Sequence, residues 1–226
     1  MGWRYDHSTP YCVPMIPLSV LYQDDHLVVI DKPAGVLVVQ APGKPSSTVV
    51  DILAAQLGRR VQAVHRLDEE TTGALSLALD DAGRVGMEIL FREHAIERDY
   101  LALASAAPSP AAGKIEANLQ EGPDGIVRVV QRGGVHAVTH YETLLRRDRC
   151  TLVRCRLETG RRNQIRVHLA ALGCPLAGDR KYGFRARPGE HFARVMLHSW
   201  QMRFQHPVTG VVVFVEAMPP ESILRV

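Results

Sequence analysis

The sequence predicts one α+β domain, in which a few helices flank a large mixed, mainly antiparallel sheet. Short apolar, β-branched segments recur along the chain, and turn-forming residues separate them at the spacing of hairpins. Far fewer segments repeat their apolar residues at helical spacing. Because the 226 residues contain no repeat and no low-complexity linker, we predict a single domain over residues 18–226, after an extended, proline-containing N-terminal arm over residues 1–17.

The predicted strands are bounded by glycine, proline or acidic turns. The first two enclose the turn at Asp24-Asp25, and residues 32–35 form a tight turn before the third. In chain order, the strands cover residues 19–22, 27–30, 36–39, 74–79, 99–104, 114–119, 126–131, 137–145, 151–157, 195–204 and 211–216.

Two helices are predicted in the first half of the chain from start and stop signals. Ser46 or Ser47 is expected to cap a helix that runs to about residue 57, where Gly58 ends it. Asp80 or Asp81 caps the next helix, which continues to about residue 92. We expect its apolar side to hold Val85, Ile89 and Leu90.

A third helix, predicted at about 162–172 and ended by Gly173, has an unusual charge pattern. Ile165, Leu169 and Leu172 should form its buried stripe, and Thr159 or Asn163 should serve its N-terminus. Arg161, Arg162 and Arg166 crowd the first turn, where the helix dipole disfavours each cation by a few tenths to ~1 kcal/mol. Arg162 and Arg166 are four residues apart, so we expect them to share a face. The pattern indicates a compensating carboxylate or phosphate, with an ordinary solvated face as the alternative.

Composition excludes several classes of protein. At 46% hydrophobic and 23% charged residues, the chain is typical of a soluble globular protein. No apolar run approaches the roughly 18 residues of a membrane span. The N-terminus shows neither a secretory signal nor a myristoylation pattern, so we expect a cytoplasmic protein with no membrane partner.

The sequence also predicts no metal or cofactor. The four cysteines form no CxxC pair and do not combine with the ten histidines at zinc-site spacing. HExxH, GxSxG, P-loop and GxGxxG motifs are absent. Reduced, mostly buried thiols are expected.

The net charge of +3 does not by itself indicate a nucleic-acid-binding protein. Arginine nevertheless outnumbers lysine heavily, and its planar guanidinium suits bidentate recognition of phosphate. A GC-rich genome would produce the same bias without any function.

The segment VHRLDEETTG, residues 64–73, places Asp68 between an arginine and two further acids. Taken alone, it reads as a solvated acidic loop. If Asp68 is buried, it needs a cation or several hydrogen bonds to stay ionised, and an arginine of residues 161–166 is the natural candidate.

Five segments together resemble the RluA-type pseudouridine synthase family. HRLDEETTG resembles its HRLD motif, and TGRRNQIRVHLAALGCPLAGDRKYG is similar to its TGRTHQIRVHLxxxGxPIxGDxxYG motif. Further segments resemble its KPxG turn, its K-x-Y-x-A strand and its LHA strand. In the family's order, the segments are residues 21–35, 65–73, 98–102, 159–183 and 196–199.

The resemblance implies an isomerase that converts uridine in RNA to pseudouridine without cofactor or metal. Asp68 matches the family's catalytic aspartate, and Arg166 matches the basic residue that keeps this aspartate charged. Tyr100 matches the active-site tyrosine, whose ring can stack on uracil and whose hydroxyl can help with the C5 proton. Attack on C1′ and removal of a 2′ proton are both open roles for Asp68.

The resemblance also implies contacts with the RNA. A flipped base leaves a space in the RNA that Arg66 is expected to occupy, although pairing with Glu69 or Glu70 is the alternative. Ile165 resembles an apolar residue of the base pocket, which core packing explains equally well. Arg161 and Arg162 are expected to meet phosphates. His65, His168, His198 and Asp179 are expected to be structural.

Two departures from the family motif stand in the third helix. Asn163 replaces the usual histidine and Arg162 replaces serine or threonine. Neither is a reacting group, so we expect activity with altered RNA contacts or loop order. Many relatives carry an added N-terminal RNA-binding domain, for which we expect no room here. The expected partner is therefore a stem-loop of ribosomal or transfer RNA, bound by a monomer.

Two other functions fit parts of the sequence. A nucleoside hydrolase would use Asp68 with Glu69 or Glu70 as paired carboxylates, but adjacent residues on one loop seldom point at the same bond. An RNA-binding protein or RNA chaperone without catalysis would have no need of Asp68, Tyr100 and Arg166 together.

Overall fold

The computed structural model describes residues 17–43 and 46–224, and most of the predicted arm lies outside them. Eleven strands form one sheet in the order β1-β2-β4-β10-β5-β9-β8-β6-β7, with β3 paired to β4 and β11 to β10. The only parallel pair within these residues is β4 with β10. The predicted α+β architecture with a mainly antiparallel sheet is confirmed.

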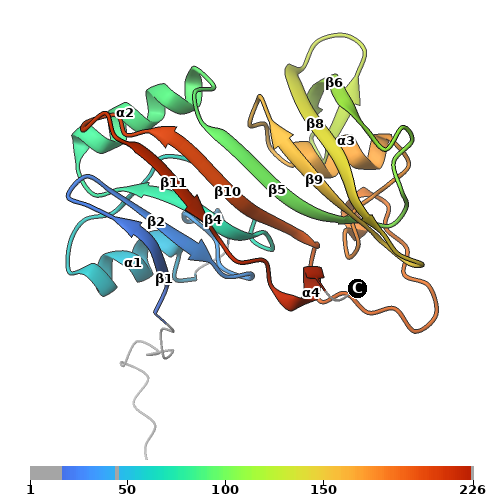
Figure 1. Ribbon diagram of the computed structural model, residues 1–226, viewed down its shortest axis with the longest axis horizontal. Coiled ribbons are helices and arrows are strands. Elements are labelled where there is room, and N and C mark those ends of the chain that lie inside the picture. The colour runs from blue at the N-terminus through green and yellow to red at the C-terminus, as the bar shows by residue number, and fades with distance from the viewer. Residues whose placement is uncertain (1–16, 44–45, 225–226) are drawn as a thin grey trace, which may run out of the picture.

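Two long central strands connect the two sides of the molecule (Figure 1). They are β5 (Glu97–Ala104) and β10 (Leu197–Gln205), which pair over most of their length. One side contains β1 (Ser19–Gln23), β2 (Leu27–Lys32), β3 (Gln62–Ala63), β4 (Thr72–Ala78) and β11 (Val212–Glu216). The other contains β6 (Ala112–Glu121), β7 (Val127–Val130), β8 (Val135–Arg146) and β9 (Thr151–Leu157).

Helices pack on both faces of the sheet. Side chains alternate between the two faces of a strand, so a strand that is apolar throughout needs cover on each face. In β2, Val28 and Ile30 pack toward α1 (Val49–Leu57), whereas Leu27 and Val29 lie in a second core with α2 (Asp81–Arg92). The third helix, α3 (Gln164–Ala171), packs its Ile165 and Leu169 against β5 and β9. Two short helices, η1 (Arg180–Tyr182) and α4 (Glu221–Leu224), follow it in the chain.

The strand predicted at residues 36–39 is absent, and that prediction was wrong. The segment crosses the beginning of α1 instead. The carbonyl oxygens of Leu37 and Val38 accept hydrogen bonds from the N–H groups of Val49 and Val50, at 2.8 and 3.3 Å. Its apolar residues are therefore buried against a helix end and not within the sheet.

Two helix faces also differ from prediction. Val85 is 46% exposed, because α2 meets the sheet through Gly83 and Met87. A Cβ atom on Gly83 would lie 2.5 Å from the carbonyl oxygen of His26, so a glycine permits this close approach. Leu172 is 39% exposed because it lies just after the end of α3. The predicted ends at Gly58 and the predicted cap at Asp80 are confirmed.

The cap of α1 is Thr48, one residue after the predicted serines. Its hydroxyl accepts a hydrogen bond from the N–H of Asp51, and the Asp51 carboxylate accepts one from the N–H of Thr48 at 2.9 Å. We expect Thr48→Ala to lower the free energy of unfolding by about 1 kcal/mol, because this reciprocal capping is lost. Urea unfolding measures the change. Exposed Ser47 offers the matched control, and an equal loss in Ser47→Ala would contradict the assignment.

Candidate active site

A cleft opens where the loop between β3 and β4 meets the beginning of α3 and the middle of β5. Asp68 comes from the loop, Tyr100 from β5, and Asn163, Ile165 and Arg166 from the region of α3. The rest of its lining is formed by Arg66, Leu67, Thr71, Leu157, Arg161, Gln164 and Leu197. The structure thus brings the three predicted catalytic residues to one cleft.

Asp68 is held from one side by two donors. Its Oδ2 accepts a hydrogen bond of 2.9 Å from Nη1 of Arg166 and one of 2.6 Å from Nδ2 of Asn163. The carboxylate side chain is 30% exposed, so it is partly open to the cleft. The hydrogen bond from the Arg166 guanidinium is charge-assisted and therefore stronger than one between neutral groups.

Arg166 lies between two carboxylates. Its Nε and Nη2 donate to the fully buried carboxylate of Asp179 at 2.7 and 2.8 Å, and its third nitrogen donates to Asp68. The Tyr182 ring lies against the guanidinium, with its centroid 5.0 Å from Cζ. Burial opposes the positive charge, but the hydrogen bonds and attraction of Asp179 and Asp68 raise the pKa of Arg166 above its usual value.

Asn163 is the most important site residue that sequence reasoning did not assign. It was expected only as a helix cap, or as a departure from the family motif that changes RNA contacts or loop order. Its backbone is left-handed (φ 53°) and its side chain does not cap α3. The amide instead bonds Asp68 and accepts a hydrogen bond of 3.0 Å from the Tyr182 hydroxyl. A polar residue at a helix start is usually a cap, so the sequence held no signal for this role.

Tyr100 lines the cleft from β5 and is only 5% exposed. Burial raises the pKa of its phenol, and the positive charge of Arg98 opposes that rise. Arg98 lies two residues earlier on the same strand face and is itself 5% exposed, with its guanidinium 5.5 Å from the Phe91 ring centroid. Tyr100 is therefore kept protonated at neutral pH and can act as a proton donor or a stacking surface.

Three of the four predicted RNA-contacting residues line the cleft, namely Arg66, Ile165 and Arg161. Arg162 does not, because its guanidinium pairs with Glu121 at the end of β6. Since α3 begins only at residue 164, Arg162 and Arg166 do not share a helix face, and that prediction was wrong.

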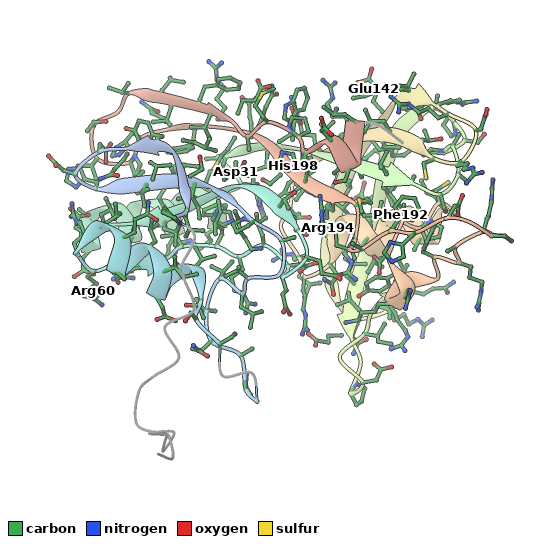
Figure 2. All side chains as sticks on the ribbon, turned by 90° about the horizontal axis from the view of Figure 1, so that it is seen from below. Asp31, Arg60, Glu142, Phe192, Arg194 and His198 are labelled. Carbon is green, nitrogen blue, oxygen red and sulfur yellow. The ribbon has the colours of Figure 1, made fainter. Side chains whose placement is uncertain are left out.

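The Asp68 loop is fixed by cations that donate to its backbone. Nζ of fully buried Lys32 donates to the carbonyl oxygens of Pro33, Glu69 and Thr71, at 2.7, 3.0 and 3.0 Å. Arg194, labelled in Figure 2, donates to the carbonyl oxygen of Glu70 at 3.3 Å. The sequence placed Lys32 in a turn but gave it no role. Its only signal was a lysine at the end of an otherwise apolar strand.

We expect the stability contributed at Lys32 to rise with pH. Burial lowers the pKa of this amine from 10.5 to about 8, against the attraction of Asp68 and Glu69. Between these values the unfolded chain holds a proton that the folded chain has lost, so raising the pH favours folding. The unfolding free energy of the wild type minus that of Lys32→Met should therefore increase from about pH 8 to about pH 10.5. Urea unfolding of both proteins at several pH values measures it, and a constant difference would contradict the assignment.

The motif histidines lie behind the cleft and hold neighbouring segments. Nε2 of His65 accepts from the N–H of Ser76 at 3.0 Å, and burial of this ring lowers its pKa to about 3. His168 bonds the Thr139 hydroxyl, and burial lowers its pKa to about 4. His198, labelled in Figure 2, bonds Thr72 of the neighbouring strand and the carbonyl oxygen of residue 217. Neutral rings with such hydrogen-bond partners suit the structural role that was predicted.

Within residues 17–43 and 46–224, histidine, cysteine and acidic side chains do not gather into a group that could hold a metal ion. Among the helices of those same residues, none combines the length and the apolar composition required to cross a membrane.

Comparison with known proteins places the chain in one family. The sequence profile described as RNA pseudouridylate synthase matches residues 26–171. "Ribosomal large subunit pseudouridine synthase D" of Zymomonas mobilis is 34% identical, over 92% of this chain and 71% of the relative. The protein of the same name from Nitrosomonas europaea is 38% identical, over 92% of this chain and 64% of the relative.

Solved structures agree with the sequence comparison. "Human RNA Pseudouridylate Synthase Domain Containing 4" superposes with a TM-score of 0.75 at 27% identity, over 91% of this chain and 90% of that one. "Human RNA Pseudouridylate Synthase Domain Containing 1" gives the same TM-score at 25% identity, over 91% and 84% of the two chains. The likeness therefore extends over both sides of the sheet.

Proposed function

The chain belongs to the RNA pseudouridylate synthase family and isomerises uridine in RNA, and from this premise we propose that Asp68 is its catalytic carboxylate. The observation that carries the proposal is the pairing of Asp68 Oδ2 with Arg166 at 2.9 Å, in the cleft that Tyr100 also lines. A carboxylate needs such a partner to remain an anion where substrate displaces water.

The reaction changes only the connection between base and sugar. The C1′–N1 bond breaks, the uracil turns, and a C1′–C5 bond forms while the C5 proton leaves and N1 gains one. Substrate and product are isomers, so no oxidant, reductant or group donor is needed. We assign Asp68 to the ribose, where it attacks C1′ or removes the 2′ proton.

Tyr100 and Arg166 have different tasks in this proposal. Tyr100 stacks on the uracil, and its hydroxyl relays the departing C5 proton by accepting it as it gives up its own, because its buried phenol lies at the cleft wall. Arg166 keeps Asp68 charged and oriented, since its other nitrogens are anchored on buried Asp179. Ile165 supplies an apolar contact for the base.

Recognition of the RNA is assigned to the rim of the cleft. Exposed Arg66 is proposed to fill the space left by the flipped base, and Arg161 to meet a nearby phosphate. Arg162 is proposed to bind a phosphate farther from the cleft, and its guanidinium would leave Glu121 when the RNA binds.

We propose that the domain comprises residues 18–226 and acts as a cytoplasmic monomer.

We propose a stem-loop of structured RNA as the substrate, with ribosomal RNA as the first target to test and transfer RNA as the second. Two relatives that cover most of this chain are named as synthases of the large ribosomal subunit. A hydrolase would need a second carboxylate at the reacting bond, and neither Glu69 nor Glu70 lines the cleft.

The proposal is tested by mapping pseudouridine in total RNA from cells with and without the gene, rescued by wild type or Asp68→Asn. We expect one or more uridines to lose modification on deletion and to regain it only with the wild type. Equal rescue by the variant would refute the role of Asp68. A deletion that changes no uridine, under conditions where the gene is expressed, would favour RNA binding without catalysis.

A further inference from the structure

The two oxygens of the Asp68 carboxylate have different surroundings. Both hydrogen bonds, from Arg166 and from Asn163, end on Oδ2. Among the described residues, Oδ1 has no hydrogen-bond partner. The donors therefore occupy one oxygen and leave the other available to substrate.

The orientation of the Asn163 amide follows from its neighbours. The backbone N–H of Val127 can only donate, and it donates to the Tyr182 hydroxyl oxygen at 3.2 Å. The Tyr182 proton is then directed to Oδ1 of Asn163, 3.0 Å away. This arrangement turns the amide nitrogen toward Asp68, whose ionised carboxylate can only accept.

The backbone supports the same arrangement. Asn163 is 8% exposed and adopts φ 53°, a left-handed conformation that asparagine tolerates better than most residues. Its position just before α3 would normally be used to cap the helix, but its side chain makes no cap hydrogen bond. The Asn163 side chain instead joins a hydrogen-bond chain from Tyr182 to Asp68, which indicates that it positions the carboxylate.

We propose that Asn163 is a positioning residue that, with Arg166, fixes Oδ2 of Asp68 and leaves Oδ1 as the oxygen that meets the ribose. Tyr182 and the N–H of Val127 set the direction of its amide. The assignment rests on the proposed catalytic role of Asp68. Because an amide does not titrate, Asn163 remains a neutral donor to Oδ2 as the pH changes.

Asn163→Asp is the decisive variant, since it keeps the shape of the side chain and replaces the donor by a carboxylate. Two carboxylates in contact share a proton, so one pKa rises strongly. Relative to wild type, we expect kcat for pseudouridine formation to fall by about 100-fold at pH 6, with a deficit that shrinks as the pH rises to 9. KM for the RNA should change little.

The groups around Asp68 that could also titrate or change the local charge are common to both proteins. They are Lys32 from β2, Glu69 from the same loop, Tyr100 from β5, Arg166 from α3 with its partner Asp179, Tyr182 from η1, and Arg66 and Arg161 at the cleft. Lys32 has a pKa of about 8, so the comparison uses the ratio of variant to wild type at each pH.

Asn118→Asp is the matched control, because Asn118 is the only other asparagine and lies on β6 away from the cleft. Its ratio to wild type should stay constant with pH. Tyr182→Phe tests the same arrangement without a new charge. It releases the amide, and we expect kcat to fall about 3- to 10-fold at every pH with unchanged RNA affinity.

The outcomes separate this inference from the proposed function. If Asp68→Asn abolishes activity while Asn163→Asp keeps a constant ratio to wild type, the role of Asn163 is refuted and that of Asp68 stands. If Asn163→Asp does not fold, wild-type activity in Tyr182→Phe still overturns the assignment. If Asp68→Asn remains active, the proposed function fails first.

Discussion

Asp68→Asn is expected to lower the rate of pseudouridine formation by at least about 10³-fold, while the fold and RNA affinity are kept. The amide has nearly the same shape as the carboxylate and can still accept hydrogen bonds from Arg166 and Asn163. It cannot carry the negative charge that both open mechanisms require, whether the anion attacks C1′ or removes the 2′ proton.

Single-turnover conversion of a substrate RNA, with pseudouridine detected by mapping, measures this loss. RNA affinity is measured in parallel by filter binding. Asp148→Asn provides the matched control, because it makes the same charge change in the exposed loop between β8 and β9. An Asp68→Asn rate within tenfold of wild type would be incompatible with a catalytic Asp68.

Arg166→Met is expected to lower the free energy of unfolding by about 3–5 kcal/mol and to inactivate the enzyme. Methionine retains the apolar length of the side chain but leaves Asp179, which is fully buried, without its two hydrogen bonds and its counter-charge. It also releases Asp68 from the partner that holds Oδ2.

Urea unfolding of the wild type and Arg166→Met at pH 7 measures the stability difference. Arg154→Met is the control, because Arg154 pairs with Glu142 at 2.6 Å on the surface, where both side chains are at least 40% exposed. Such a surface pair contributes about 0–1 kcal/mol. Equal losses in the two variants would show that the Asp68–Arg166–Asp179 group is no more important to stability than a surface ion pair.

The two experiments are complementary. Asp68→Asn removes a charge that chemistry needs and leaves the supporting hydrogen bonds in place. Arg166→Met removes the hydrogen bonds to Asp68 and Asp179 and leaves these two carboxylates without the cation between them. Loss of activity with full stability in the first variant, and loss of both in the second, is the pattern expected of a reacting group and its anchor.

Strands and helix ends were predictable where residues close together in the sequence determine the local structure. Alternation of side chains in β2 produces two buried faces, and a strand with apolar residues on both faces reads clearly as part of a covered sheet. Gly58 and Asp80 ended and began helices as predicted, because a left-handed glycine and an N-cap aspartate act within one turn.

Prediction failed where a distant segment decided the local structure. Residues 36–39 have the composition of a strand, but their carbonyl groups are used by α1. Gly83 determines which side of α2 meets the sheet, through a contact with His26 that helical periodicity does not contain. Helix or strand propensity describes the conformations that a segment favours in isolation. Tertiary packing then decides which of these conformations the segment adopts.

By itself, the sequence determined the fold class and the identity of the family's motifs, and it predicted which residues would carry the chemistry. Only the tertiary structure decided how they meet. It placed Asp68 against Arg166, 98 residues away, turned Arg162 toward Glu121 and drew Asn163 away from its helix to the Asp68 carboxylate. The physical reason is that hydrogen bonds and ion pairs depend on distances of about 3 Å between side chains. Spacing along the chain does not specify such distances until the sheet and α3 have packed.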